Sequence, residues 1–411
     1  MRSFLSVKLS SLLLVFIAGC NGNDQKPDHA FEAVKIDSTK YKGVAFSGVS
    51  QKYDSSDGYF YNFSSGSIEK TTFSQSGDPL MWHSGEQLYF FNRKNLSGNF
   101  FIIDSDDPSK GPGSAKSFQN ITDGGPQKIL LLKNKHFLIV EMGASVSGGG
   151  RVVELDPETG ETVGQGFQFN VPDSNPFQPV DLTEKVIQGS RYIFISHRGS
   201  HFETGSTQAI INHSQAVFAM KDTDQGLSLV ANGSPVARPY ATEPLFFHAD
   251  KESSMIGGLC SMFDPQDCQQ GFEAISFATI EQSEVATLSD KVEISKNKIL
   301  KNGSFANGFA TNSVFASVNV RDPDHGQGAG NFMIQLHIDG QNSTWTYDTI
   351  HHYQGDQNYG LGMMVSDPDA QILLFGENPE PDVFMLHINI DNKNKSEVRL
   401  DRFPYNGVLM P

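Results

Sequence analysis

The chain has 411 residues and a formal net charge of −16, with 31 Lys and Arg against 47 Asp and Glu. A chain with so large a negative charge repels other polyanions, which argues against nucleic acid or an anionic lipid surface as a partner. The length fits two or three domains or one large closed architecture, and 31 Phe and 11 Tyr can fill a sizeable core.

The N-terminal segment has the features of a secretory signal. Its two cations, Arg2 and Lys8, come first, the apolar run LSSLLLVFI follows, and the small residues Ala18 and Gly19 precede Cys20. A charged start, an apolar run of about 7–15 residues and a small-residue cleavage site define such a signal, and this run is too short to span a membrane. An ordinary secretory signal with an unrelated cysteine is the alternative.

The quartet Ile17-Ala18-Gly19-Cys20 resembles the lipobox of bacterial lipoproteins. The resemblance implies that residues 1–19 are removed and that Cys20 is lipidated, and several acyl chains on one residue make a stable anchor. The residue after Cys20 is an asparagine rather than an acid, which favours the outer membrane by analogy with enteric bacteria. The sequence therefore predicts a cell-envelope protein, held by lipid and facing the periplasm or the cell surface.

Residues 20–40 are polar and show no sustained period, which predicts a flexible tether before a globular domain over 41–411. Two cysteines remain in that domain, Cys260 and Cys268, on either side of the turn-like segment SMFDPQD. In an exported protein such a pair predicts a disulfide, worth about 2–3 kcal/mol for so small a loop. A metal site or a catalytic thiol is the alternative, but neither cysteine has a histidine at ligand spacing.

From residue 41 onward, short runs rich in Phe, Val, Ile and Leu alternate with clusters of Gly, Asp, Asn, Ser and Pro. The runs have the length of strands, about five to nine residues. No apolar stripe with the helical period is bounded by helix caps. The sequence therefore predicts an all-β chain.

Groups of four such runs recur at intervals of about 45–60 residues, which is typical of β-propeller blades. A four-stranded blade cannot bury both of its apolar faces alone, whereas a ring of blades buries both. We therefore predict a β-propeller of seven four-stranded blades, with an uncertainty of one. Two tandem β-sandwiches and a β-solenoid are the alternatives, although the break in composition that tandem sandwiches should show is absent from the middle of the chain. The expected units cover 41–75, 79–118, 126–169, 178–230, 242–289, 305–350 and 358–403.

The segment LDPETGETV predicts a tight hairpin, in which Asp156 closes an Asx turn, Pro157 presets φ and Gly160 supplies a positive φ. It resembles the hairpin between the third and fourth strands of YVTN-type and quinoprotein-like propellers. Quinoprotein repeats carry a tryptophan shortly after this turn, where the present chain has Val163 and Phe167. The resemblance therefore implies a propeller but does not extend to a quinone cofactor.

Several acidic turns contain the residue types that calcium prefers. Asp322 and Asp324, with Gln327 as a further oxygen donor, come nearest to the alternating spacing of a calcium loop, followed by Asp104, Asp106 and Asp107. Neither group is followed by the bidentate Glu of an EF-hand, and acidic hairpin turns are common in an acidic β-protein. The sequence predicts no metal or other cofactor, and Asp322 and Asp324 are the weak calcium candidates.

The sequence favours a binding or scaffolding module for a protein or glycan of the cell envelope. It has no Gly-x-Ser-x-Gly elbow, and its glycine-rich run GASVSGGG joins two expected strands rather than opening a helix. Since fold alone does not name a function, the expectation rests on the loops of the propeller. The long ones are expected at 143–150, 198–215, 257–271 and 321–330.

A propeller hydrolase, lyase or lactonase with metal or carboxylates at the mouth of the channel is the alternative. Its candidate residues are Glu141, His197, His248 and Glu377, all expected at strand ends. The sequence assigns no catalytic role to any of them, so the question of enzyme activity stays open, with binding favoured.

Overall fold

The computed structural model divides the chain into two units, residues 1–30 and 31–411. The described residues all belong to the second unit, so the predicted signal peptide, Cys20, Cys268, Asp322 and Asp324 lie outside them. They are 35–50, 52, 54–76, 79–84, 87–92, 99–104, 116–117, 126–141, 150–171, 177–198, 200–202, 209–211, 215–237, 246–249, 254–258, 260–261, 270–275, 280, 291–294, 299–308, 313–321, 330–339, 344–352, 363–367, 371–377, 383–390 and 392–411.

The strands of the described residues form seven sheets of four or five strands, numbered in chain order, and one two-stranded sheet. Sheet 1 consists of β1 (Gly43–Val49), β2 (Ser55–Asn62), β3 (Ile68–Ser76) and β31 (Phe403–Met410). Sheet 2 consists of β4 (Pro79–Ser84), β5 (Gln87–Asn92), β6 (Asn99–Asp104) and β7 (Lys116–Ser117). Sheet 3 consists of β8 (Pro126–Leu131), β9 (Phe137–Glu141), β10 (Arg151–Leu155) and β11 (Thr162–Phe167).

In sheets 4 to 7, as in sheets 1 to 3, each of the four strands named is antiparallel to its neighbours among the four. Sheet 4 consists of β12 (Pro179–Ile187), β13 (Ser190–His197), β16 (Ala216–Thr223) and β17 (Gly226–Leu229). Sheet 5 consists of β18 (Phe246–Ala249), β19 (Ser254–Gly258), β21 (Gln270–Ile275) and β22 (Lys291–Ile294). Sheet 6 consists of β23 (Ile299–Gly308), β24 (Ser313–Arg321), β25 (Gly330–Asp339) and β26 (Thr344–His352), and sheet 7 of β27 (Met364–Asp367), β28 (Ile372–Glu377), β29 (Val383–Asn389) and β30 (Lys395–Leu400).

Four short elements of the described residues lie outside this pattern. The strands β14 (Ser200–Phe202) and β15 (Ala209–Ile211) form a separate hairpin between β13 and β16. The strand β20 (Cys260–Ser261) pairs in parallel with β23 and so adds a fifth strand to sheet 6. A 3₁₀ turn, η2 (Ala231–Gly233), follows β17. Within the described residues, no helix is long and apolar enough to cross a membrane.

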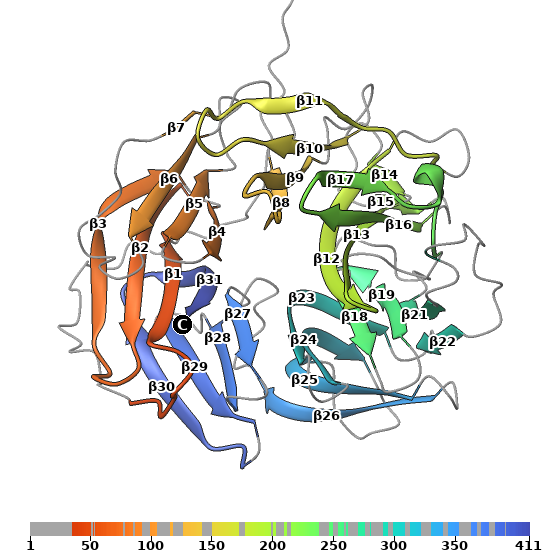
Figure 1. Ribbon diagram of the computed structural model, residues 1–411. Helices are drawn as coiled ribbons and strands as arrows, with labels where there is room; N and C mark the ends of the chain where they lie inside the picture. Colours follow the sequence, from red (N-terminus) through yellow and green to blue (C-terminus); the bar gives the residue numbers. More distant parts are fainter. Residues whose placement is uncertain are drawn as a thin grey trace, which may run out of the picture. The chain divides into compact units, whose positions relative to one another are not determined.

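Successive sheets contact one another, and the series returns to its start. The strand β31 contacts β4, β4 contacts β8, β8 contacts β12, and β12 contacts β18. Contacts of β22 with β26 and of β23 with β27 join sheets 5, 6 and 7, and β27 and β28 contact β31. Figure 1 shows the strands of this unit in that order, with the last strand beside the first. Antiparallel sheets that follow one another and close in this way form a β-propeller, so the prediction of an all-β propeller is confirmed.

The alternation of side chains along each strand explains why the strands are continuous apolar runs. On β9, Phe137 and Ile139 pack in a cluster shared with sheet 2, whereas Leu138 and Val140 pack in one shared with sheet 4. Successive side chains of a strand point to opposite faces, so both faces of sheet 3 are covered. Full burial of such a side chain is worth about 1.5–3 kcal/mol, which favours the stacking of neighbouring sheets.

The last strand of the chain completes the first sheet. β31 pairs with β1 in an antiparallel ladder from Gly43 opposite Met410 to Val49 opposite Phe403. The sequence analysis assigned only the three strands of 41–75 to this unit, and it did not foresee the fourth strand from the C-terminus. The two ends of the globular domain are therefore held together in one sheet.

Candidate functional site

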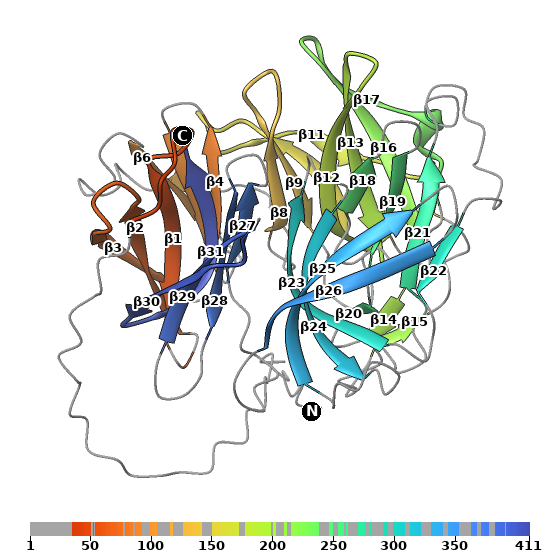
Figure 2. The ribbon, with the colours of Figure 1, turned by 90° about the horizontal axis from the view of Figure 1, so that it is seen from below.

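Each sheet has two distinct ends, which we call the loop end and the turn end. At the loop end the first strand begins and the second strand ends, as in sheet 4, where Pro179 of β12 lies opposite His197 of β13. In sheet 1 the first position is taken by β31 and the second by β1, so Phe403 and Val49 lie at its loop end. The turn end carries the short turns, such as the one between Ile187 and Ser190. In Figure 2 the hairpin β14–β15 lies toward one end of sheet 4 and the β16–β17 turn toward the other.

The four predicted long loops all emerge at the loop end. They correspond to the connections β9–β10, β13–β16, β19–β21 and β24–β25. Each of these joins the second and third strands of its sheet, in sheets 3 to 6. In antiparallel sheets of the same strand order such connections leave from the same end. The sequence placed the loops along the chain, and the strand pairing brings them to one end.

Three of the four predicted catalytic candidates also lie at this end. Glu141, His197 and Glu377 are the last residues of β9, β13 and β28, the second strands of sheets 3, 4 and 7. His248 lies one residue before the end of β18, a first strand, which runs toward the turn end. All four candidates thus lie at or next to strand ends, as predicted, but His248 lies at the opposite end of its sheet because first and second strands are antiparallel. The side chains of His248 and Glu377 lie outside the described residues.

Glu141 is engaged in a buried ion pair. Its side chain is fully buried, and its Oε2 accepts a hydrogen bond from Arg151 Nε at 2.6 Å. The two residues lie opposite each other, at the end of β9 and the start of β10. A buried carboxylate requires such a partner, so the pair fixes the two strands at the point where the β9–β10 loop leaves them.

The side chain of His197 is held in a fixed orientation at the loop end of sheet 4. The imidazole is 1% exposed, stacks on Phe177, and accepts a hydrogen bond at Nδ1 from the backbone N–H of Gln178 at 3.0 Å. Burial lowers the pKa of His197 from 6.5 to about 4. The ring is therefore neutral at pH 7, with its proton on Nε2.

We expect His197 to make the fold less stable in mild acid. Between pH 6.5 and 4 the unfolded chain binds a proton at this residue that the folded chain does not, so stability falls as the pH falls. The loss approaches about 3 kcal/mol near pH 4 and then levels off. His197→Gln keeps an acceptor and removes the titration, so its denaturation midpoints should change less between pH 7.5 and 4.5. Parallel curves for the two proteins would contradict this assignment.

An ion pair links the first strands of sheets 3 and 4 near the same end. Lys128 Nζ lies 3.4 Å from Asp181 Oδ1, and Asp181 is buried while Lys128 is half exposed. Each is the third residue from the start of its sheet's first strand, after Pro126 and Pro179. The sequence analysis missed this pair, although an alignment of the repeats on these prolines would have placed both residues at one level.

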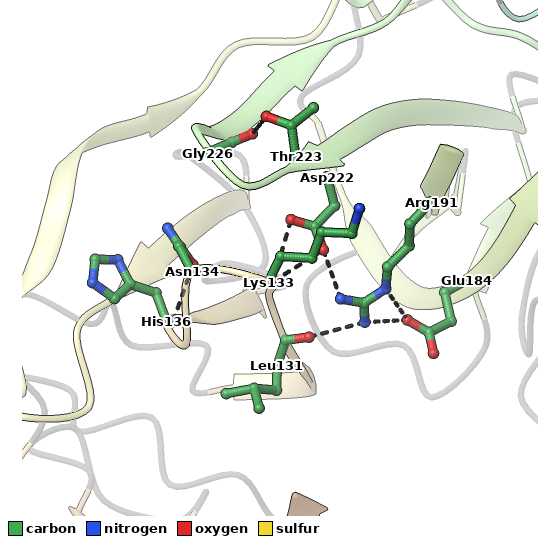
Figure 3. A network of polar contacts seen from close by, with 9 residues as sticks. All are labelled: Leu131, Lys133, Asn134, His136, Glu184, Arg191, Asp222, Thr223 and Gly226. Carbon is green, nitrogen blue, oxygen red and sulfur yellow. Dashed lines mark hydrogen bonds and ion pairs between the residues drawn. The ribbon is translucent and has the colours of Figure 1, made fainter. Parts of the chain in front are cut away.

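A larger polar network joins sheets 3 and 4 at the turn end (Figure 3). Arg191 Nη1 donates to Asp222 Oδ2 at 2.6 Å, and its Nη2 donates to the carbonyl oxygen of Leu131 in sheet 3 at 2.9 Å. Arg191 Nε also donates to Glu184 at 2.7 Å. From sheet 3, the backbone N–H of Lys133 donates to Asp222 Oδ2 at 3.2 Å. These contacts make the network a clamp between two neighbouring sheets.

A second carboxylate is held beside this network. Glu154 Oε1 accepts a hydrogen bond from Asn134 Nδ2 at 2.7 Å and lies 2.6 Å from His136 Nδ1. The backbone N–H of His136 in turn donates to Asn134 Oδ1 at 3.1 Å. The sequence analysis named none of these residues, because they come together only through the pairing of β9 with β10. Their mutual contacts fix the turn between β8 and β9.

The predicted hairpin of sheet 3 is confirmed in detail. Asp156 Oδ1 accepts a hydrogen bond from the backbone N–H of Glu158 at 2.7 Å, and this bond lowers the pKa of Asp156. Gly160 has a φ of 74°, as the turn requires. The resemblance of this segment to propeller hairpins thus rests on a turn with a structural role.

Within the described residues, no three His, Cys, Asp or Glu side chains are close enough to hold a metal ion. The calcium candidates Asp322 and Asp324 lie outside those residues, as does Cys268 of the predicted disulfide. Cys260 lies in β20, opposite Lys301 of β23. The metal and disulfide predictions therefore remain predictions.

No protein-family model matches the sequence, and no curated protein matches it. Among solved structures, it is similar to a putative 6-phosphogluconolactonase from Bacteroides fragilis, with a TM-score of 0.53 and 11% identity over 91% of this chain and 99% of that one. A putative 6-phosphogluconolactonase from Bacteroides uniformis gives 0.50 and 11%, over 90% and 99%. A protein from Lactobacillus plantarum gives 0.50 and 10%, over 90% and 100%. At such identity the likeness concerns the fold alone, and this fold is a β-propeller.

Proposed function

We propose that this chain is a lipid-anchored protein of the cell envelope whose seven sheets are the blades of a propeller that binds a protein or glycan at its loop end. One observation supports the binding role most strongly. The long connections of sheets 3 to 6 all join second to third strands and so leave from the same end. Four adjacent loops on a rigid scaffold are a usual arrangement for recognition.

The chemistry of the strand ends agrees with a binding role. Glu141 is paired with Arg151, and His197 uses Nδ1 to accept a backbone hydrogen bond. A general base or nucleophile needs an atom within hydrogen-bond reach of a substrate. These two side chains instead fix the strands from which the loops leave.

The anchor is proposed from the resemblance of Ile17-Ala18-Gly19-Cys20 to a lipobox. In the native host, wild-type protein should sediment with the outer membrane, and Cys20→Ala should be released in soluble form. Recovery of the Cys20→Ala protein in the membrane at the wild-type level would contradict lipid anchoring through this residue. The proposed disulfide is tested on the same samples, since Cys260→Ser should then leave Cys268 open to a thiol reagent.

The partner is tested by affinity capture from native membranes after mild cross-linking. We expect a stoichiometric partner with the wild type and its loss when residues 322–329 are replaced by a Gly-Ser segment of equal length. The matched control replaces residues 105–115, which join third and fourth strands at the turn end, and should keep the partner. Capture that survives the first change and fails with the control would place binding at the other end.

The likeness of the fold to two putative 6-phosphogluconolactonases favours one alternative, a lactonase with its site at the loop end. Lys128 lies half exposed beside the buried Asp181 at the loop end, where its ammonium group could bind an anionic sugar lactone. Turnover of 6-phosphogluconolactone by wild type, and its loss in Lys128→Met, would support this alternative. Metal analysis of the same material tests the calcium candidates Asp322 and Asp324.

A further inference from the structure

The closure of the fold lies at a seam between sheets 1 and 7. Phe46 and Tyr61 of sheet 1 share one buried cluster with Ile372 and Leu374 of sheet 7. At the turn end of this seam, the ladder between β1 and β31 begins with Gly43 opposite Met410. A force that separates Gly43 from Met410 breaks the β1–β31 ladder one pair at a time, starting at this end.

Residues 35–41 lie at that end and contact both sheets. Ile36 is 5% exposed and belongs to the seam cluster, and its backbone N–H donates to the carbonyl oxygen of Phe63 at 3.0 Å. Asp367, the last residue of β27 in sheet 7, accepts hydrogen bonds from Lys40 Nζ and the Tyr41 hydroxyl. Six of these residues, 35–40, fall in the segment that the sequence predicts to be a flexible tether. Within it, Ile36 is buried and Lys40 contacts Asp367, whereas Lys35, Asp37, Thr39 and Lys40 are exposed.

The contacts of residues 35–41 hold sheets 1 and 7 together. Asp367 is buried, and a buried carboxylate that loses its donors is left with an uncompensated charge. Ile36 is buried in the cluster that sheets 1 and 7 share, so its removal leaves a cavity in that cluster. Both contacts must be released before sheet 7 can move away from the start of β1.

We propose that residues 35–41 are a strap that locks the closure seam, so that sheets 1 and 7 separate only after Ile36 and Asp367 are released. The strap lies before β1, and any pull on the chain N-terminal to residue 35 reaches it before it reaches the β1–β31 ladder. The strap holds the seam whether or not Cys20 is lipidated.

Hydrogen exchange of the full chain in detergent tests this proposal. In the double variant Ile36→Ala, Asp367→Ala we expect the amides of β31 and β27 to exchange at least about tenfold faster, while those of β13 in sheet 4 keep their rates. Tyr41→Phe removes one donor to Asp367 and leaves the core intact, so it should give a smaller acceleration in the same strands. This milder variant decides the matter if the double variant fails to fold.

The matched control is Asp348→Ala, which removes an exposed hydrogen bond between the Asp348 carboxylate and His337 Nε2 in sheet 6. It should leave β31 and β27 unchanged. Unchanged exchange of β31 in the strap variants would overturn the proposal. Equal acceleration in all sheets would also overturn it, because the segment would then stabilise the whole fold rather than the seam.

Discussion

Replacing Asp222 with alanine is expected to lower the free energy of unfolding by about 3–5 kcal/mol. The carboxylate is buried, lies 2.6 Å from Arg191 Nη1, and accepts a hydrogen bond from the backbone N–H of Lys133. Without it, Arg191 keeps Glu184 and the carbonyl oxygen of Leu131 as its acceptors among the described residues, and the contact between sheets 3 and 4 loses its central acceptor. Equilibrium unfolding in urea measures the loss.

The neighbouring Asp224 provides the control. It is exposed in the turn between β16 and β17, and Asp224→Ala should change the free energy of unfolding by less than about 0.5 kcal/mol. Similar small effects of the two substitutions would show that the clamp adds little to the stability of the fold. A large effect of Asp222→Ala alone would establish it.

Phe46→Ala is expected to cost about 3–5 kcal/mol as well, for a different reason. Phe46 is fully buried on β1, in the cluster that joins sheets 1 and 7, and its ring stacks on Tyr59 with centroids 5.2 Å apart. The cavity left by alanine lies in the seam where the chain closes on itself. Denaturant unfolding monitored by circular dichroism gives the magnitude.

Phe46→Leu removes fewer atoms and should cost clearly less, since the loss grows with the volume of the cavity. If both substitutions cost equally little, the ring of Phe46 does not fill a closed seam. If both abolish folding, the position tolerates no change of shape. Only a graded response agrees with packing between two sheets.

Much of the fold follows from the sequence because burial on both faces leaves a direct trace in each strand. The run KHFLIVEM is apolar at every position from Phe137 to Val140, as a strand covered on both sides requires. The turn at Asp156 and Gly160 is equally local, since its residues satisfy one another within six positions. Such features depend on residues that are close together in the sequence, so they can be predicted from the sequence.

The closure and the buried charges could not be predicted in the same way. β31 pairs with β1 across almost the whole chain, and no residue near 403–410 signals that partner. Arg191 and Asp222 occupy the ends of apolar runs, where charges are usually solvated, and only the approach of sheet 3 buries them. The packing of Ile36 was missed because the surrounding segment 20–40 is polar.

The candidate site was predicted in part. Glu141 and His197 do lie at strand ends on the same side of neighbouring sheets, but both make contacts that stabilise those ends. Positions along the chain show where a strand stops. They do not show that Arg151 or Gln178 supplies a partner once the strands are paired.

Binding of the partner at the loop end is tested most directly by site-specific photo-cross-linking in native membranes. The photoreactive residue is placed at positions 145 and 327, in the β9–β10 and β24–β25 connections, and at exposed positions 158 and 225 in two turns at the other end. The account predicts one shared adduct from positions 145 and 327 and none from 158 and 225. Adducts from 158 and 225 with none from 145 and 327 would contradict it.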